Sequence, residues 1–316
     1  MLGFSLAKDS FQFVEIQYVE GKPVVQRFAH RPTPVPFSLE HALKPDNQDP
    51  FKQVIREAVD VFQLRGPVAV SLDHRLAFVK KFLVDLAMPD EDVEEQLNWE
   101  FRQIFPEASL GEYQFVYERL PGGFYDHLDA VLAVAYRKQL LDVIQELFRP
   151  TGLEVAHVDL DVFSALYAVN RLYGTREYDL CVLADVRGDV AKLEFVRKGE
   201  FFDLHAARYS DLEESQEMVF QSDETAAKLI NKEIRRKLLE YSSEDQEKPV
   251  DILFLFGDRA SEEMVDYLAM SPAREIVLVE PFKKLEMNIS DSGISDEDML
   301  SSKYTVGVGS ALRTVF

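Results

Sequence analysis

Residues at three predicted turns could bind a phosphate group and a divalent cation. Asp185 follows an apolar run and offers a carboxylate, a ligand type that magnesium prefers. Lys8 and Arg187 are cations that could neutralise phosphate oxygens. Gly188 and Gly257 have no Cβ, so the backbone N–H groups beside them could approach a phosphate closely. The competing interpretation is that all three segments are ordinary turns with no ligand.

Other chemistry finds little support in the sequence. The six histidines have no metal-ligand spacing, and no Gly-x-Ser-x-Gly nucleophile motif is present. His157 and Asp159 are interpreted as a structural pair at a strand-to-helix junction. The single cysteine, Cys181, lies in an apolar run and is expected to be a buried strand residue. A single cysteine cannot form an intrachain disulfide, and proteins of a reducing compartment usually have none.

Two of these turns belong to a pattern that occurs twice, about 180 residues apart. Residues 4–16 precede a turn at Gly21, and residues 184–196 precede a turn at Gly199. The alternating apolar positions of the second strand are Phe11, Phe13 and Ile16 in one copy and Ala191, Leu193 and Val196 in the other. Such alternation predicts strand–turn–strand units, and their repetition predicts a duplicated domain.

Between the two copies we predict an inserted unit of strand, helix, strand, strand and helix. Its strands are expected at residues 76–86, 113–117 and 129–136, and its helices after Pro89 and at 138–148. The first helix has a core-facing stripe of Val93, Leu97, Phe101 and Ile104. Trp99, beside this stripe, is expected to be a partly buried packing residue, with partner anchor as the minority alternative.

Further helices and strands are predicted from the periodicity of apolar residues and from the glycines and prolines that end them. Helices are expected at 51–64, 162–172, 223–241, 261–270 and at the end of the chain, and buried strands at 68–72 and 250–256. Residues 31–36 are proline-rich and predict an extended loop. Residues 287–302 are acidic and serine-rich and predict a mobile loop.

The composition limits the classes of partner. Lys and Arg total 35 against 56 Asp and Glu, a formal net charge of −21. Such a surface disfavours nucleic-acid binding and direct adhesion to anionic lipid. No signal peptide and no membrane-spanning stretch is recognised. We therefore expect a cytoplasmic protein that reaches a membrane only through a partner.

Several segments, in their order along the chain, resemble the PilM family of pilus-assembly proteins, relatives of FtsA in the actin-like ATPase superfamily. The most specific is residues 86–100, with methionine, an acidic helix start and Trp99-Glu100, followed by Pro106. The other similar segments are residues 129–138, 151–159, Glu280-Pro281-Phe282 and 307–313. The resemblance covers nearly the whole chain.

The resemblance implies an α/β actin-like (ribonuclease H-like) fold of duplicated domains with an inserted α+β subdomain. The expected division is core domain 1 at 1–75, 155–178 and 304–316, the inserted subdomain at 76–154 and core domain 2 at 179–303.

It also implies a nucleotide site of three loops, from which this chain departs. The candidate cofactor-binding residues are Ser5, Lys8, Asp185, Arg187, Gly188 and Gly257, with Asp185 as the metal ligand. Where the family has Asp-x-Gly, the first hairpin has Ser5-Leu6-Ala7, and Arg187 stands where the second hairpin would carry a glycine. In the third loop, Asp258 follows Gly257 instead of a second glycine. We therefore expect no bound cofactor, with ATP and Mg²⁺ as the alternative.

Two classes of function remain. The resemblance implies a cytoplasmic adaptor, with little or no ATP hydrolysis, in the inner-membrane platform of type IV pili or related secretion filaments. It would bind the cytoplasmic tail of a membrane protein in a groove between the first core domain and the inserted subdomain. Candidate contacts are Leu83, Leu86, Tyr113 and Phe115, although core strand positions are the favoured interpretation of these residues. The alternative is an enzyme, an actin-like ATPase or small-molecule kinase. The oligomeric state is left open.

Overall fold

The first of three sheets is built from the start of the chain. A computed structural model describes residues 1–86, 88–106, 109–120, 128–188, 190–209, 222–241, 249–288 and 301–313. The sheet has the order β14-β3-β2-β1-β4-β8, in which β1, β2 and β3 are antiparallel and β1, β4 and β8 are parallel. Its strands are β1 (Leu2–Leu6), β2 (Ser10–Val19), β3 (Lys22–Pro32), β4 (Pro67–Leu72), β8 (Glu154–Leu160) and β14 (Glu286–Met287).

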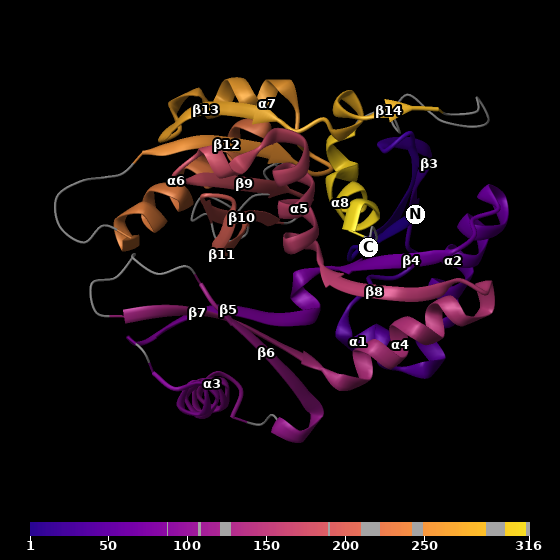
Figure 1. Cartoon of the computed structure of the whole chain (residues 1–316), viewed down its shortest axis with the longest axis horizontal. Helices are drawn as coiled ribbons and strands as arrows, with labels where there is room; N and C mark the ends of the chain where they lie inside the picture. The colour runs from indigo at the N-terminus through magenta and orange to yellow at the C-terminus, as the bar shows by residue number, and fades with distance from the viewer. Residues whose placement is uncertain are drawn as a thin grey trace.

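The second sheet repeats this arrangement, in the upper left of Figure 1. It has the order β11-β10-β9-β12-β13, again an antiparallel meander followed by parallel strands. Its strands are β9 (Cys181–Val186), β10 (Val190–Arg197), β11 (Glu200–Arg208), β12 (Val250–Phe256) and β13 (Ala273–Leu278).

Backbone details confirm the repeat predicted from the sequence. The register shifts at Glu15/Ile16 in β2 and at Phe195/Val196 in β10, so the irregularity falls at matching positions of both copies. Each following turn has two residues of positive φ, 51° and 81° at Glu20 and Gly21 and 51° and 83° at Lys198 and Gly199. Two such residues form the turn whose twist suits a tight hairpin.

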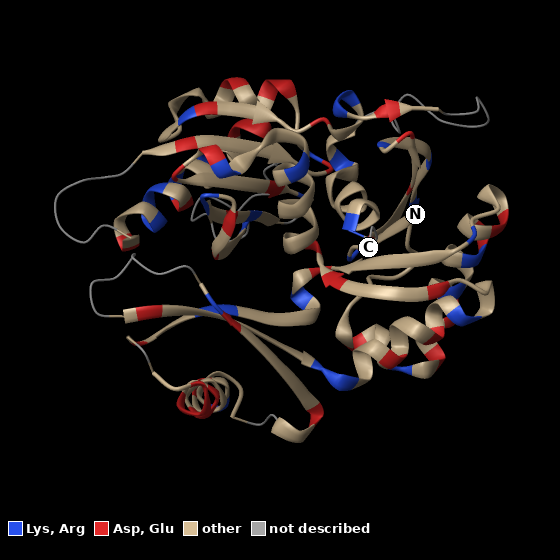
Figure 2. Cartoon of the chain, viewed as in Figure 1, with Lys and Arg blue, Asp and Glu red and all other residues tan. Residues whose placement is uncertain are grey.

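The third sheet, β5-β7-β6, forms the lower left of Figure 1 with a helix across one face. Its elements are β5 (Ala77–Asp85), α3 (Asp90–Ile104), β6 (Tyr113–Arg119) and β7 (Leu128–Arg137). Val93, Leu97 and Phe101 are buried on the sheet, as predicted. The outer side of α3 is largely acidic (Figure 2).

Two predictions for α3 were wrong. Trp99 is 58% exposed, because it points away from the sheet that buries Leu97 and Phe101. Ile104, assigned to the core-facing stripe, is 38% exposed at the last residue of the helix.

The remaining helices cover the first two sheets. They are α1 (Leu39–Ala42), α2 (Asp49–Phe62), α4 (Lys138–Phe148), α5 (Asp161–Tyr173), α6 (Asp223–Tyr241), α7 (Glu262–Tyr267) and α8 (Thr305–Arg313). Helices α2 and α4 share a core with the first sheet, and α6 and α7 share one with the second. Helix α8 returns to pack on β1, β2, β4 and α5. No described helix has the length and apolarity needed to cross a membrane.

Some connections differ from the prediction. Strands β13 and β14 were not predicted. Most of the loop predicted at 287–302 lies outside the described residues, but Ser301 and Ser302 are buried. Strand β14, from the segment assigned to core domain 2, pairs with β3 of the first sheet. The domain boundaries stay a prediction.

Candidate functional site

The predicted ligand residues lie at the ends of β1, β9 and β12. Ser5 is buried in β1, where it pairs with Gln12 and Ser71. Lys8 is in the turn after β1, and its carbonyl accepts a hydrogen bond from the Phe37 N–H at 2.6 Å. The first turn therefore folds back on the segment after β3.

Asp185, next to the last residue of β9, lies in a buried network of charges. Its carboxylate lies 2.8 Å from Nε of Arg187 and 2.6 Å from Nζ of Lys192. The Lys192 ammonium also binds the carboxylate of Asp161, at the start of α5. The three side chains Asp161, Asp185 and Lys192 are at most 2% exposed. Lys192, on β10, thus bridges the neighbouring strand β9 to helix α5, which follows the first sheet.

A second pair of charges adjoins this network. The guanidinium of Arg75 donates to both carboxylate oxygens of Asp73, at 2.9 and 2.6 Å. The His74 N–H donates to Asp161 at 3.0 Å, so the turn after β4 is held against the first residue of α5. Three carboxylates, those of Asp73, Asp161 and Asp185, are therefore matched by three cationic side chains.

The protonation states agree with this pairing. Burial and the Arg187 charge alone would lower the pKa of Lys192, but the carboxylates of Asp161 and Asp185 raise it above its usual value. Burial alone would raise the pKa of Asp161, yet the Lys192 ammonium lowers it well below its usual range. Burial alone would raise the pKa of Asp73, but the hydrogen bonds from Arg75, together with the charges of Lys192 and Arg75, lower it to about 2. All three groups are charged at neutral pH.

The residues present do not fit Mg²⁺ or a nucleotide phosphate. The carboxylate assigned to the metal, Asp185, is already bound by two cations, and a divalent ion beside it would meet Lys192 and Arg187. Potential ligand atoms of Asp73, His74 and Asp161, two carboxylate oxygens and an imidazole nitrogen, also lie within 4.8 Å of one another. There too the carboxylates are bound by Arg75 and Lys192. A buried site that is already neutral gains uncompensated charge when a cation enters.

The two glycines have different surroundings. Gly257 has a φ of +112°, and a Cβ there would lie 2.7 Å from Oδ1 of Asp185 and 2.4 Å from the Val186 carbonyl. Glycine is required because the loop after β12 packs directly on the end of β9. Gly188 is exposed, and a Cβ would meet nothing within 4 Å. The close contacts at Gly257 are thus with Asp185 and Val186 of the same chain.

Glu194 is a buried acid that the sequence analysis missed. It lies two residues after Lys192 on β10, is 1% exposed, and its Oε2 has no hydrogen-bond partner. Burial raises its pKa well above the usual value, and the Lys192 charge opposes this only in part. The carboxyl is therefore retained as the neutral acid over a wider pH range than in the unfolded chain.

We expect Glu194→Gln to flatten the pH dependence of stability. The folded state keeps a proton that the unfolded chain loses near the ordinary pKa of 4.5, so stability is full below that pH and falls as pH rises to the folded-state pKa. The neutral amide removes this fall. Urea midpoints at pH 5, 7 and 9 should show a growing advantage of the variant over wild type. Exposed Glu200→Gln is the control, and parallel curves for the Glu194 variant would contradict the assignment.

The four predicted partner contacts lie on the two outer strands of the third sheet. Leu83 lies near the end of β5 and is 39% exposed, and Leu86 follows directly after that strand and is 63% exposed. On β6, the rings of Tyr113 and Phe115 pack 4.9 and 5.0 Å from the Phe101 ring. Since β7 separates β5 from β6, the four residues do not form one cluster.

The fold defines a class. The repeated meander-based sheets, with a three-stranded unit inserted between them in sequence, constitute the actin-like ATPase fold. The chain belongs to the family of type IV pilus assembly protein PilM, whose model matches residues 3–202. A comparison with curated protein sequences gave no match.

Solved structures resemble the chain over nearly its full length. A PilM-PilN type IV pilus biogenesis complex is 19% identical with a TM-score of 0.69, covering 99% of this chain and 97% of that chain. The cytoplasmic domain of EpsL, an inner membrane component of the Vibrio cholerae type II secretion system, is 14% identical with a TM-score of 0.45 and coverages of 100% and 95%. A Bacteroides thetaiotaomicron protein of actin-like ATPase fold and unknown function has 14% identity, a TM-score of 0.47 and coverages of 94% and 92%. At these identities the likeness concerns the fold alone.

Proposed function

We propose that this chain is a cytoplasmic adaptor of a type IV pilus or related filament platform, and that it binds the cytoplasmic tail of an inner-membrane protein. Membership of the PilM family supports the pilus assignment. The similar structure named as a complex of PilM with PilN supports a protein partner. The chain would reach the membrane through that partner.

The adaptor is proposed to work without ATP hydrolysis. The observation that carries this is Lys192, whose buried ammonium lies between Asp161 and Asp185. A metal-bound nucleotide needs the Asp185 carboxylate, which here is neutralised by the chain itself. The alternative, an ATPase or kinase, would require Lys192 and Arg187 to leave Asp185, exposing a buried carboxylate.

We expect ATP with Mg²⁺ at millimolar concentration to leave the melting temperature unchanged. A ligand present at 100 times its Kd stabilises a folded protein by about 2.7 kcal/mol, which raises the melting temperature by several degrees. Differential scanning fluorimetry with ATP, ADP and Mg²⁺ alone makes the measurement. A clear rise with ATP and Mg²⁺ that Asp185→Asn abolishes would overturn the nucleotide-free assignment.

Tail binding is tested by retention of the purified chain on the immobilised cytoplasmic tail of a neighbouring pilus membrane protein. The same tail with scrambled sequence is the control. Specific retention supports the adaptor function, and failure to retain the chain on any such tail would leave only the family and the fold.

A further inference from the structure

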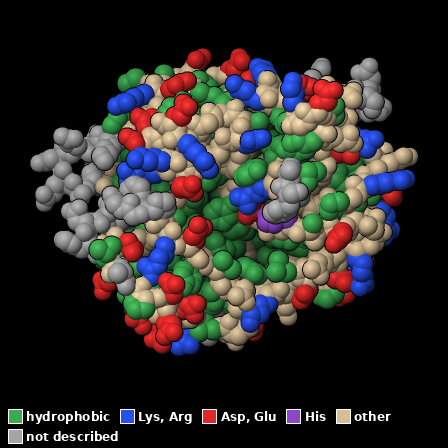
Figure 3. Space-filling model, in the orientation of Figure 1, with side chains coloured by type: hydrophobic (Ala, Val, Ile, Leu, Met, Phe, Trp, Pro, Cys, Tyr) green, Lys and Arg blue, Asp and Glu red, His purple; other side chains and the backbone are tan. Residues whose placement is uncertain are grey.

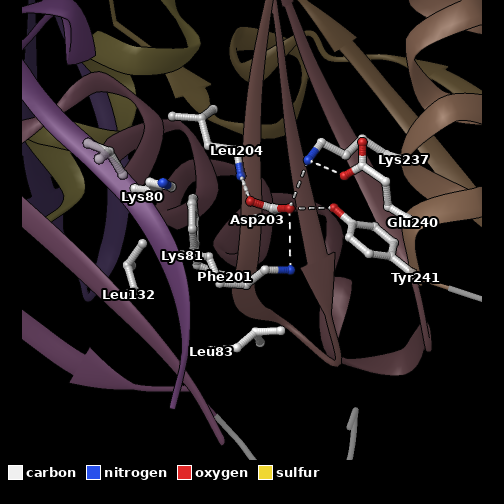
Figure 4. Close-up of a pocket in the computed structure, with 11 residues that line it drawn as sticks. Lys80, Lys81, Leu83, Leu132, Phe201, Asp203, Leu204, Lys237, Glu240 and Tyr241 are labelled. Carbon is white, nitrogen blue, oxygen red and sulfur yellow. Dashed lines mark hydrogen bonds and ion pairs between the residues drawn. The ribbon is translucent and has the colours of Figure 1, made fainter. Parts of the chain in front are cut away.

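The inserted unit meets the second sheet and its helix α6, together called the second half, around a cavity of about 470 Å³. Strands β5 and β7 form one wall, and β11 and α6 form the other (Figure 4). In the orientation of Figure 1, the molecular surface is hollowed near its centre, with hydrophobic side chains around the hollow (Figure 3). Strand β5 passes close to β11, but the two belong to separate sheets. Within the described chain, side chains and not a shared backbone ladder therefore join these two strands.

One lysine of the inserted unit reaches across to the second half. Lys81, on β5, places its ammonium 3.3 Å from the carboxylate of Asp203 on β11. The same ammonium lies 3.9 Å from the ring centroid of Phe202 and 4.7 Å from that of Tyr241. Aromatic faces attract cations, and a carboxylate beside them strengthens the attraction. Phe202, Asp203 and Tyr241 thus form an ammonium-binding site, here called the cage, and its occupant is a side chain of the same protein.

The cage is held in shape by the second half alone. The Tyr241 hydroxyl donates to the Asp203 carboxylate at 2.8 Å, and the Lys237 ammonium lies 3.4 Å from the same carboxylate (Figure 4). The rings of Phe195 and Phe202 pack edge-on against Tyr241, with centroids 5.4 and 5.0 Å away. All five residues belong to β10, β11 and α6. The cage therefore does not depend on the inserted unit for its geometry.

The lysine and the carboxylate that meet in the cage are both largely buried. The side chains of Lys81 and Asp203 are 9% and 10% exposed. Burial lowers the pKa of Lys81, and the Asp203 carboxylate opposes this fall. Burial alone would raise the pKa of Asp203, but the charges of Lys81 and Lys237 hold it below its usual value. Removing one partner of such a pair leaves the other as an uncompensated buried charge.

The contact is specific to one of two adjacent lysines. Lys80 also adjoins the cavity, but its ammonium lies 4.9 Å from the ring centroid of Phe82. Phe82 belongs to the core between the third sheet and α3. Lys80 is exposed and stays with the inserted unit, whereas Lys81 is held by the second half.

Apolar contacts beside the cavity add to this junction. Ala130 and Leu132 of β7 belong to the same apolar core as Phe201 of β11. The cavity interrupts the packing of the two units, and a region with few buried apolar contacts opens more easily than a filled core. The lysine contact is therefore expected to weigh strongly in the balance between a closed and an open arrangement.

We propose that Lys81 is a latch, whose ammonium in the cage keeps the inserted unit closed against the second half. When the ammonium leaves the cage, the inserted unit moves away as one body and the cavity widens. The unit is joined to the first sheet and its helices through residues 73–76 and at the junction of β7 with α4, where backbone rotation absorbs the movement. A ligand or protein that binds the open form better than the closed one shifts the population towards it. The inference does not depend on the proposed adaptor function.

The test measures the distance between two spin labels in the full chain by double electron–electron resonance. Glu95→Cys on α3 and Leu239→Cys on α6 carry the labels, because both positions are exposed, whereas Cys181 is buried. Lys81→Met retains most of the stem and removes the charge. It should raise the fraction at longer distance about tenfold or more, as expected for a broken buried ion pair.

The matched control is Lys80→Met, which changes the neighbouring lysine on the same strand. It should keep the wild-type distance, because Lys80 contacts Phe82 and not the cage. Asp203 keeps Lys237 and Tyr241 in Lys81→Met, so this variant should fold, and circular dichroism verifies that it does. An unchanged distance in Lys81→Met refutes the latch. An equal change in both variants would mean that any substitution disturbs β5, and refutes it as well.

A double-mutant cycle assigns the effect to the contact between Lys81 and Asp203. Asp203→Asn removes the carboxylate charge and should also raise the fraction at longer distance. The double variant should be no more open than the more open single variant, because both substitutions break the same contact. Additive effects would show that the two residues act separately, and would overturn the latch. None of these outcomes bears on retention by an immobilised tail, so the adaptor function is tested independently.

Discussion

Replacing Lys192 by methionine is expected to destabilise the protein by about 3–5 kcal/mol, because it leaves the buried carboxylates of Asp161 and Asp185 without their shared cation. Methionine nearly matches the length of the lysine stem, so the lost charge dominates over lost packing. Arg187 still neutralises Asp185, whereas Asp161 keeps hydrogen bonds from two backbone N–H groups and the His74 ring nitrogen 3.8 Å away. Urea denaturation at pH 7 measures the change.

The control is Lys198→Met on the same hairpin. Lys198 is 76% exposed and 3.9 Å from Asp179, so its loss should change stability by less than about 1 kcal/mol. Adding Asp161→Asn to Lys192→Met removes the orphaned charge and should restore part of the lost stability. A Lys192→Met protein as stable as the Lys198 variant would show that the ammonium does not bridge the two halves.

The paired hairpins were predictable because their signals are local. Alternation in β2 and β10 and the glycines at 21 and 199 are readable from a few consecutive residues, and short-range sterics fix the turns. The helices of the inserted unit were predictable for the same reason, since apolar residues at helical spacing form one stripe that must be buried against another element. Trp99 was mispredicted although the same spacing places it outward: it lies two residues from both Leu97 and Phe101, on the opposite side of the helix, and it is exposed.

The buried charges could not be predicted because their partners come from distant segments. In β10, alternation assigns Ala191 and Leu193 to the core and so assigns Lys192 and Glu194 to solvent. The structure buries both faces, since the strand has the α6 core on one side and the junction with α5 on the other. The one available signal was a lysine and a glutamate within an otherwise apolar strand. Their meaning depends on Asp161, and that contact exists only after the two halves pack.

Gly309→Ala is expected to destabilise the protein by about 3 kcal/mol or more, because a Cβ there would lie 1.8 Å from the carbonyl oxygen of Ser164. Gly309 is in α8 and Ser164 in α5, so the contact is between the backbones of two helices. A carbonyl inside a helix cannot rotate away as a side chain can, and α8 must shift. That shift would disturb the packing of α8 on β1 and β4, since Gly3 of β1 is also in close contact with the α8 backbone.

Gly307→Ala in the same helix separates this steric effect from helix propensity. The nearest atom to a Cβ at position 307 is Cγ2 of Val14 at 3.0 Å, and a valine methyl can move by a few tenths of an ångström. Alanine also favours the helix over glycine by about 1 kcal/mol, so this variant should be near neutral. Urea unfolding of both variants gives the comparison. Equal effects at the two positions would mean that α8 does not depend on the close approach to Ser164 and that it packs loosely on α5.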